Sequence, residues 1–130
     1  MRQKQGDAVK LFNGEQGEWQ GEIENLDRKS ATISLKTQTQ PQHAEPDIWI
    51  AFAPIKFGKI DFLVQKVTEL GAAHILPVQT QHTIVSRVND ERLLLNVIEA
   101  SEQAERVTLP TVSPYQPLEK LLSEWPKERT

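Results

Sequence analysis

The chain has 130 residues, of which 38% are hydrophobic and 25% charged, and its formal net charge is −3. No apolar run approaches the roughly 20 residues that a membrane span needs, and the lack of cysteine excludes disulfides and thiol chemistry and suits a cytoplasmic protein. The acidic balance excludes a protein that holds nucleic acid by overall charge, so any such contact must come from a local basic patch.

The N-terminal part of the chain predicts an antiparallel β sheet. Asn13-Gly14 is a strong hairpin signal, because both residues accept a positive φ. Apolar and polar residues alternate over three short stretches, as in strands: residues 8–12, 19–26 and 31–36. Three strands rarely close a barrel alone, so we expect an incomplete β barrel in residues 1–43.

A linker and an α/β domain are expected next. Residues 37–46 are rich in Gln, Thr and Pro without periodicity, which predicts a linker, and residues 44–130 are assigned to the second domain. Residues 47–55 and 74–78 predict two parallel strands. Between them lies the apolar stripe of a helix that Gly71 ends, formed by Ile60, Leu63, Val64, Val67 and Leu70.

The rest of the chain predicts two helices and an edge strand. Asn89 caps the first helix, which is expected to run to about Arg106 with an apolar stripe of Leu94, Val97, Ile98, Ser101 and Ala104. Residues 109–112 predict an edge strand. A last helix is expected over residues 118–125, with its apolar side chains facing inward. These are Leu118, Leu121, Leu122 and Trp125. The fold class is therefore a two-domain α+β or α/β protein.

The residues alone identify no catalytic group. They contain no nucleophile–base arrangement and no phosphate loop, and the three histidines lack metal-ligand spacing. His74 reads as a core histidine, whereas His82 lies in a polar loop and is the likelier to meet a ligand. The three tryptophans could stack on bases, but tryptophan in an alternating strand or amphipathic helix is more often core.

Two charged groups of residues each have two interpretations. Around the helix predicted over residues 60–70 lie Lys56, Lys59, Lys66 and Glu69. They form either a solvated face or a basic edge that meets phosphate. One face of the helix that Asn89 caps carries Glu99, Glu102 and Arg106, with Gln103 beside them. They form either an exposed ion-pair face or an arginine that carboxylates orient toward a phosphate or a base edge.

Three stretches of the chain resemble motifs of one family. Residues 66–77 match K-x-T-E-L-G-x-x-x-I-x-P, residues 99–110 match E-A-x-E-Q-x-x-R-x-x-x-P, and residues 2–14 match R-x-x-x-G-D…L-F-[DN]-G. In this order and spacing the chain resembles the RsmE family of ribosomal RNA methyltransferases. Its members methylate N3 of a uridine in small-subunit (16S) ribosomal RNA, with S-adenosylmethionine as the donor.

The resemblance implies a PUA-like β barrel followed by a SPOUT-class α/β domain with a trefoil knot. Family chains are longer, so the first one or two barrel strands and the C-terminal half of the SPOUT domain are expected to be missing here. The knot and the S-adenosylmethionine site would then lie beyond Thr130, and the 130-residue chain alone would be inactive. The alternative is a non-catalytic RNA-binding or assembly module of the same fold.

The resemblance also implies partners and contact residues. The partner would be small-subunit ribosomal RNA or the assembled subunit, with a homodimer at full length, a cytoplasmic location and no membrane. The candidate RNA or substrate contacts are Arg2, Lys4, Lys56, Lys59, Lys66, Glu69, Glu102, Gln103 and Arg106. Arg106 is expected to contact phosphate or substrate, with Glu102 and Gln103 orienting it. His82 stands where the family pattern has an arginine.

Overall fold

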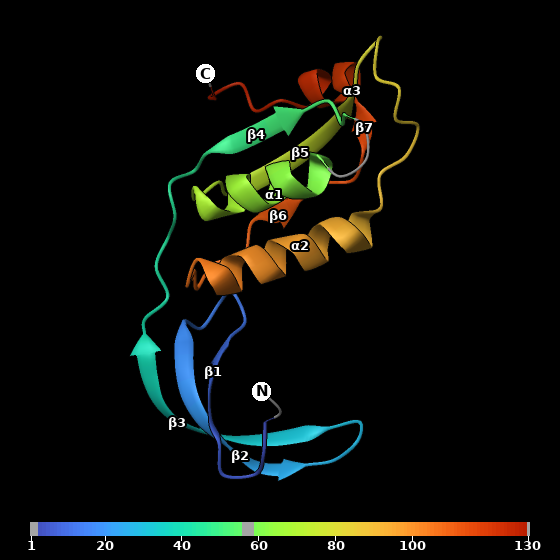
Figure 1. The fold of residues 1–130 in the computed structure, drawn as a ribbon. Helices are drawn as coiled ribbons and strands as arrows, with labels where there is room; N and C mark the ends of the chain where they lie inside the picture. Colours follow the sequence, from blue (N-terminus) through green and yellow to red (C-terminus); the bar gives the residue numbers. More distant parts are fainter. Residues whose placement is uncertain (1–2, 56–58, 130) are drawn as a thin grey trace.

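The computed structural model describes residues 3–55 and 59–129, which form a β sheet and an α/β domain joined by an extended segment (Figure 1). The antiparallel sheet has the order β1-β2-β3. Its strands are β1 (Ala8–Phe12), β2 (Glu18–Leu26) and β3 (Ala31–Gln40). The three predicted strands are confirmed. β3 is longer than predicted, because Thr37, Gln38 and Gln40 pair with β2, so the linker begins after Gln40.

The β1–β2 turn forms where the sequence predicts a hairpin, but of the Asn13-Gly14 pair Gly14 takes a positive φ, of 84°, and Asn13 does not. The Asn13 side-chain oxygen accepts hydrogen bonds from the backbone N–H groups of Glu15 and Gln16, at 3.0 and 2.9 Å. The turn closes at Gly17, which has a φ of +73° and approaches β3 so closely that a Cβ would lie 2.2 Å from the Gln40 carbonyl oxygen. Only glycine fits this position without displacing the backbone.

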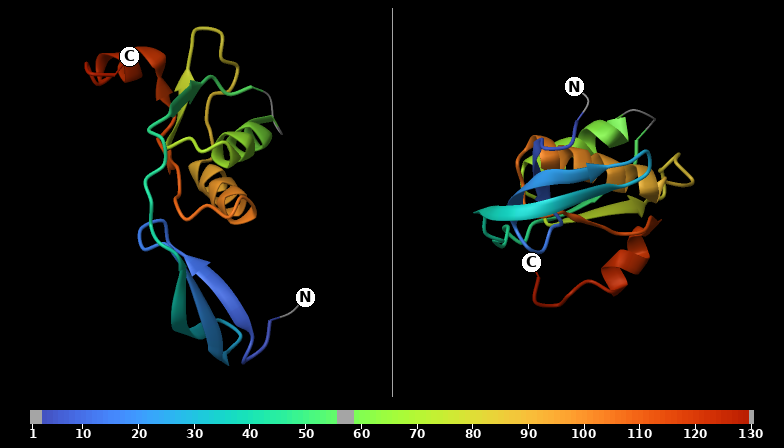
Figure 2. Two further views of the ribbon diagram at one scale, coloured as in Figure 1. Left: turned by 90° about the vertical axis from the view of Figure 1, so that its left-hand side faces the viewer. Right: turned by 90° about the horizontal axis from the view of Figure 1, so that it is seen from below.

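The α/β domain is built on a parallel sheet with β5 (His74–Gln79) between β4 (Trp49–Phe52) and β6 (Thr111–Val112). The predicted parallel strand–helix–strand unit is confirmed. The remaining elements are α1 (Lys59–Glu69), α2 (Asp90–Gln103), β7 (Gln116–Pro117) and α3 (Leu118–Ser123). Helices α1 and α2 cover one face of the sheet, and α3 lies on the other (Figure 2).

The central strand continues through a proline. Pro77 cannot donate a ladder hydrogen bond, but it falls between the residues that pair with β6 and those that pair with β7, namely His74 and Ile75 on one side and Val78 and Gln79 on the other. The sequence gives no sign of β7, which has two residues, one of them a proline. It pairs with the part of β5 that follows Pro77.

Two apolar clusters form the core of the α/β domain. The first contains Val64, Ile75, Leu93 and Val97, and the second contains Leu76, Val78 and Leu121. The predicted inward positions of Leu70, Leu94, Ala104 and Leu122 are wrong, because all four are exposed. Periodicity could not assign the register of α2, since three leucines stand together at 93–95 and only Leu93 is buried.

Helix α2 begins as predicted and ends earlier than predicted. The Asn89 side chain caps it by accepting a hydrogen bond from the Arg92 backbone N–H at 3.0 Å. At its other end Glu105 takes a φ of 53°, and the Arg106 N–H bonds to the Ser101 carbonyl at 2.9 Å. Arg106 therefore lies in a turn. None of the described helices is long and apolar enough to cross a membrane.

Candidate nucleic-acid interface

A groove lies at the carboxyl ends of β4 and β5, the edge of a parallel sheet where ligands usually bind. Pro54, Lys59, Thr80 and His82 contribute to its walls. Thr80 and Thr83 fix the turn after β5, since their hydroxyl oxygens lie 2.8 Å apart and the Thr80 N–H bonds to the Thr83 hydroxyl at 2.9 Å. This turn leaves His82 exposed beside Lys59 on the groove.

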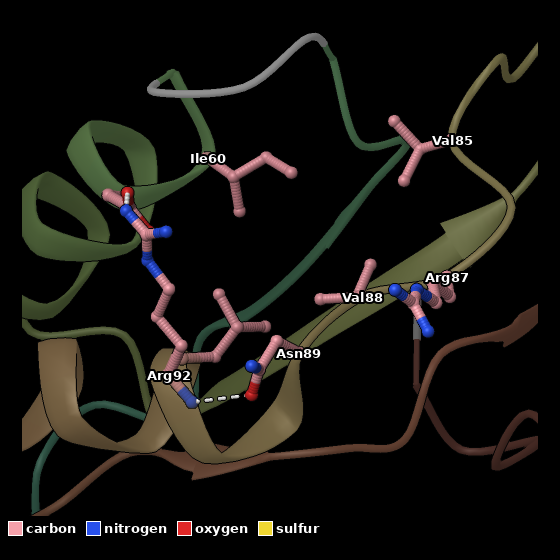
Figure 3. A pocket seen from close by; sticks show the side chains of 8 residues that line it. Ile60, Val85, Arg87, Val88, Asn89 and Arg92 are labelled. Carbon is pink, nitrogen blue, oxygen red and sulfur yellow. Dashed lines mark hydrogen bonds and ion pairs between the residues drawn. The ribbon is translucent and has the colours of Figure 1, made fainter.

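A second cavity lies nearby, between the start of α1 and the start of α2 (Figure 3). Arg92 reaches from α2 toward α1, where its guanidinium binds the Asp61 carboxylate, and Arg87 lies on the opposite side (Figure 3). Neither arginine was among the residues predicted from the sequence. The one sequence feature that could have indicated them is their position, since Arg87 precedes and Arg92 follows the helix-capping residue Asn89.

Basic side chains and two helix starts meet at one end of the α/β domain. Lys59, Arg87 and Arg92 lie there with His82. Asp61, Asp90 and Glu91 lie in the first turns of the same helices, so the side-chain charges balance, and Asp61 pairs directly with Arg92. Because both helices start at this end, the positive ends of their dipoles point the same way and favour an anion. We call Lys59, His82, Arg87 and Arg92 the strand-end patch, and phosphate is the ligand group that such a patch attracts.

An apolar groove runs from the strand-end patch along α1. Lys59 lines this groove and also the groove at the carboxyl ends of β4 and β5. From Lys59 the apolar groove continues past Phe62 and Lys66 to Leu70. Phe62 is 61% exposed and Leu70 is 83% exposed. The Lys66 ammonium lies 5.8 Å from the centre of the Phe62 ring and donates a 2.7 Å hydrogen bond to Glu69. That bond lowers the pKa of Glu69 and partly neutralises Lys66.

Glu102 and Gln103 lie elsewhere. They line a polar groove between α1 and α2, together with Asp61, Gln65 and Glu99. The residues that line this groove include three carboxylates and no lysine or arginine, so the groove repels phosphate and these two residues do not extend the strand-end patch. Lys4 is exposed in the β sheet domain, where its backbone N–H bonds to the Asp7 carboxylate at 2.8 Å. Arg2 and Lys56 lie outside the described residues.

Arg106 is buried, with 8% of its surface exposed. Its guanidinium donates to the carbonyls of Thr68 and Ala72 and faces Glu45, with 3.5 Å between Arg106 Nε and a Glu45 carboxylate oxygen. Burial lowers the pKa of Arg106, and the Glu45 charge opposes that shift. The expectation that Glu102 and Gln103 orient Arg106 is wrong, since Glu45 and backbone carbonyls do so. No sequence pattern pointed to Glu45, because it lies in the linker, far from Arg106 along the chain.

The tryptophans divide between the two interpretations. Trp49 and Trp125 pack on the second core cluster, with 5.3 Å between their ring centres, so the core interpretation is confirmed for both. His74 packs against Trp49 at 4.5 Å. Trp19 is only partly buried and lines a groove on the β sheet with Leu11 and Leu35. Across residues 3–55 and 59–129, no three potential metal ligands come together.

Comparison with known families gives the class of the protein. The model of an RNA methyltransferase domain matches residues 42–130, and that of an RNA methyltransferase PUA domain matches residues 1–36. Ribosomal RNA small subunit methyltransferase E from Rickettsia conorii is 35% identical over 112 residues, covering 86% of this chain and 46% of the relative. Its counterpart from Synechocystis is 30% identical and covers 87% of this chain and 38% of the relative.

Solved structures agree with these matches. A probable rRNA methyltransferase from Porphyromonas gingivalis superposes with a TM-score of 0.83 at 28% identity, covering 97% of this chain and 54% of that one. A methyltransferase E from Neisseria gonorrhoeae, bound to S-adenosyl methionine, has the same fold, with a TM-score of 0.80 at 24% identity over 96% of this chain and 55% of that one. The chain belongs to the RsmE family of ribosomal RNA methyltransferases. It spans about half the length, or less, of the curated relatives it matches.

Proposed function

We propose that this chain is the RNA-facing part of an S-adenosylmethionine-dependent methyltransferase that modifies N3 of a uridine in small-subunit ribosomal RNA. Family membership supports the reaction class. The strand-end patch is the observation that carries the RNA contact, because it gathers Lys59, His82, Arg87 and Arg92 at one end of a chain whose net charge is −3. The further expectations of a cytoplasmic location and a full-length homodimer belong to the same proposal.

The strand-end patch is not assigned to the methyl donor. S-adenosylmethionine carries a sulfonium cation as well as a carboxylate, and Lys59, Arg87 and Arg92 would attract the carboxylate but repel the sulfonium, which is the reacting group. The groove along α1 is apolar but bordered by Lys59 and Lys66. We therefore assign RNA binding to these residues and derive no step through the donor. In the proposed reaction the uridine N3 proton has to leave, and no described group is assigned as its acceptor.

Binding of small-subunit ribosomal RNA tests the patch. Replacing Lys59 with Gln should weaken binding about threefold to tenfold and reduce the slope of log K against log salt by about 1, since one phosphate contact is lost. Lys120→Gln is the matched control, because Lys120 is an exposed lysine on α3, across the sheet. Equal behaviour of the two variants would remove the strand-end patch from the proposal.

Methyl transfer tests the reaction separately. The chain is incubated with small subunits and isotopically labelled donor, and the nucleosides are analysed by mass spectrometry for a methyl group on uridine N3. Label at this atom supports the reaction class and would show that the chain itself holds the donor. RNA binding without label is expected of a chain that is only the RNA-facing part, and it equally fits the alternative of a non-catalytic RNA-binding or assembly module. A chain that neither binds nor methylates ribosomal RNA contradicts both.

A further inference from the structure

We propose that the linker residues Gln42 and Glu45 position the β sheet on the α/β domain and thereby set the distance between the strand-end patch and Lys4, the candidate RNA contact of the β sheet. The part of this inference that concerns RNA rests on the function proposed above, whereas the part that concerns the domain positions does not. Gln42 and Glu45 are only three positions apart, and each one binds a different domain. We call them the linker clamp.

Glu45 anchors the linker to the α/β domain. One of its carboxylate oxygens accepts a hydrogen bond from the Thr108 hydroxyl at 3.0 Å and lies 3.5 Å from Arg106 Nε. The Arg106 side chain is 7% exposed and the Glu45 side chain 20% exposed, so little water screens this pair. Because Arg106 also donates to the carbonyls of Thr68 and Ala72, Glu45 is connected to the end of α1 and to the α1–β5 turn.

Gln42 anchors the linker to the β sheet. Its side-chain oxygen accepts from the Gly17 N–H at 2.8 Å, and its side-chain nitrogen donates to the Gly14 carbonyl at 2.9 Å. The same turn touches the α/β domain directly, since a Cβ on Gly14 would lie 3.4 Å from the Leu109 side chain. Figure 1 shows the β1–β2 turn as the part of the sheet closest to the α/β domain. The clamp therefore acts at the point of contact.

This arrangement has a consequence for RNA binding. Two surfaces held at a fixed spacing bind one ligand as a unit, whereas a free linker lowers the effective concentration of the second surface. Neither clamp residue lies on the strand-end patch. Their replacement should therefore change the apparent affinity through domain position, and leave the phosphate contacts themselves in place.

The test measures the domain positions in the whole chain. Because the chain has no cysteine, Lys29→Cys and Glu119→Cys introduce two unique spin-label sites, both exposed, one on each domain. Distances are recorded by double electron–electron resonance in this background and in two variants, Gln42→Ala and Glu45→Gln. Glu24→Gln is the control, because it removes an exposed carboxylate from β2 and leaves the linker intact.

We expect both clamp variants, but not the control, to broaden the distance distribution without changing the circular dichroism of the folded chain. An unchanged distribution in Gln42→Ala overturns the inference even if Glu45→Gln is destabilised, because Gln42 pairs with no buried charge. Affinity for small-subunit ribosomal RNA should fall about threefold to tenfold in both variants. Broadening with unchanged affinity overturns the RNA part. If the parent chain binds no ribosomal RNA, the proposed function fails and the distances alone decide the role of the clamp.

Discussion

The two domains are held together by different forces. In the α/β domain Val64, Ile75 and Val97 are completely buried, and two apolar clusters fill both faces of the sheet. Among the described residues of β1–β3, Ile23 is the single large apolar side chain that is buried, and the other buried side chain of β2 is the carboxylate-bearing Glu18. The comparison teaches that apolar burial stabilises the α/β domain, whereas hydrogen bonds and turn geometry stabilise the β sheet.

Core truncation should give the largest difference between the domains. Ile75→Ala removes a fully buried side chain from the first cluster and should lower the free energy of unfolding by about 2–5 kcal/mol. Ile23→Ala should lower the free energy of unfolding clearly less than Ile75→Ala, because fewer apolar groups surround the cavity it leaves. Urea denaturation followed by amide hydrogen exchange measures both domains in one experiment. An equal or larger cost for Ile23→Ala would contradict the comparison.

Glycine replacement should destabilise the β sheet more than the α/β domain, the reverse of core truncation, because the β sheet depends on its turns. Gly71→Ala places a side chain at a φ of +87° in ordinary van der Waals contact with the Glu45 carboxylate, at 3.7 Å, and should lower the free energy of unfolding by about 1–2 kcal/mol. Gly17→Ala strains the backbone in the same way, at a φ of +73°, and its Cβ would also lie 2.2 Å from the Gln40 carbonyl oxygen. It should therefore lower the free energy of unfolding by more than Gly71→Ala. Hydrogen exchange of the β3 amides should rise in Gly17→Ala and stay unchanged in Gly71→Ala. Intact β3 protection in Gly17→Ala would show that the turn adapts.

The smallest expected effect is a pH dependence confined to the β sheet. The Thr39 hydroxyl, 2.6 Å from Glu18, lowers the pKa of that carboxyl, and Lys10 at 3.1 Å adds to the shift while burial opposes it. Because the folded pKa lies below the usual glutamate pKa of about 4.5, the contribution of Glu18 is complete above about pH 4.5 and is lost as the pH falls through the folded pKa. Glu18→Gln should flatten the acid limb of β sheet stability.

Unfolding of the β sheet between pH 3 and 7 is the measurement, with Glu24→Gln as the matched control on the same strand. Glu24 is exposed and points into solvent, so its replacement should leave the acid limb unchanged. If Glu18→Gln and Glu24→Gln give the same acid limb, the buried carboxylate contributes nothing to the stability of the sheet.

The fold was largely predictable because its elements carry strong local signals. The Asn13-Gly14 hairpin, the Asn89 cap and Gly71 with its φ of +87° all lie where their physical chemistry requires them. The errors come from tertiary contacts. β3 extends into the polar residues 37–40 because β2 supplies partners for their backbone, and α2 turns toward Leu93 because α1 packs against it.

The candidate site was less predictable. Lys59 was selected from the sequence, and it lies on the strand-end patch. Arg87 and Arg92 join it only because two helix starts meet at one end of a parallel sheet. Arg106 matches a family motif, yet its partner Glu45 lies 61 positions earlier in the chain. No spacing rule connects a linker carboxylate to a buried arginine at that distance.

The pairing pattern of the two sheets also determines the order in which they form during synthesis. Among the described residues, β1, β2 and β3 pair with their sequence neighbours, so these pairings can form once Gln40 has left the ribosome. β5 waits for β6 and β7, and therefore for Gln116 and Pro117. A nascent chain paused between these points carries a paired β1–β3 sheet and an open edge on β5, the species that binds chaperones or aggregates. Slow translation of residues 80–110 would lengthen the life of that species.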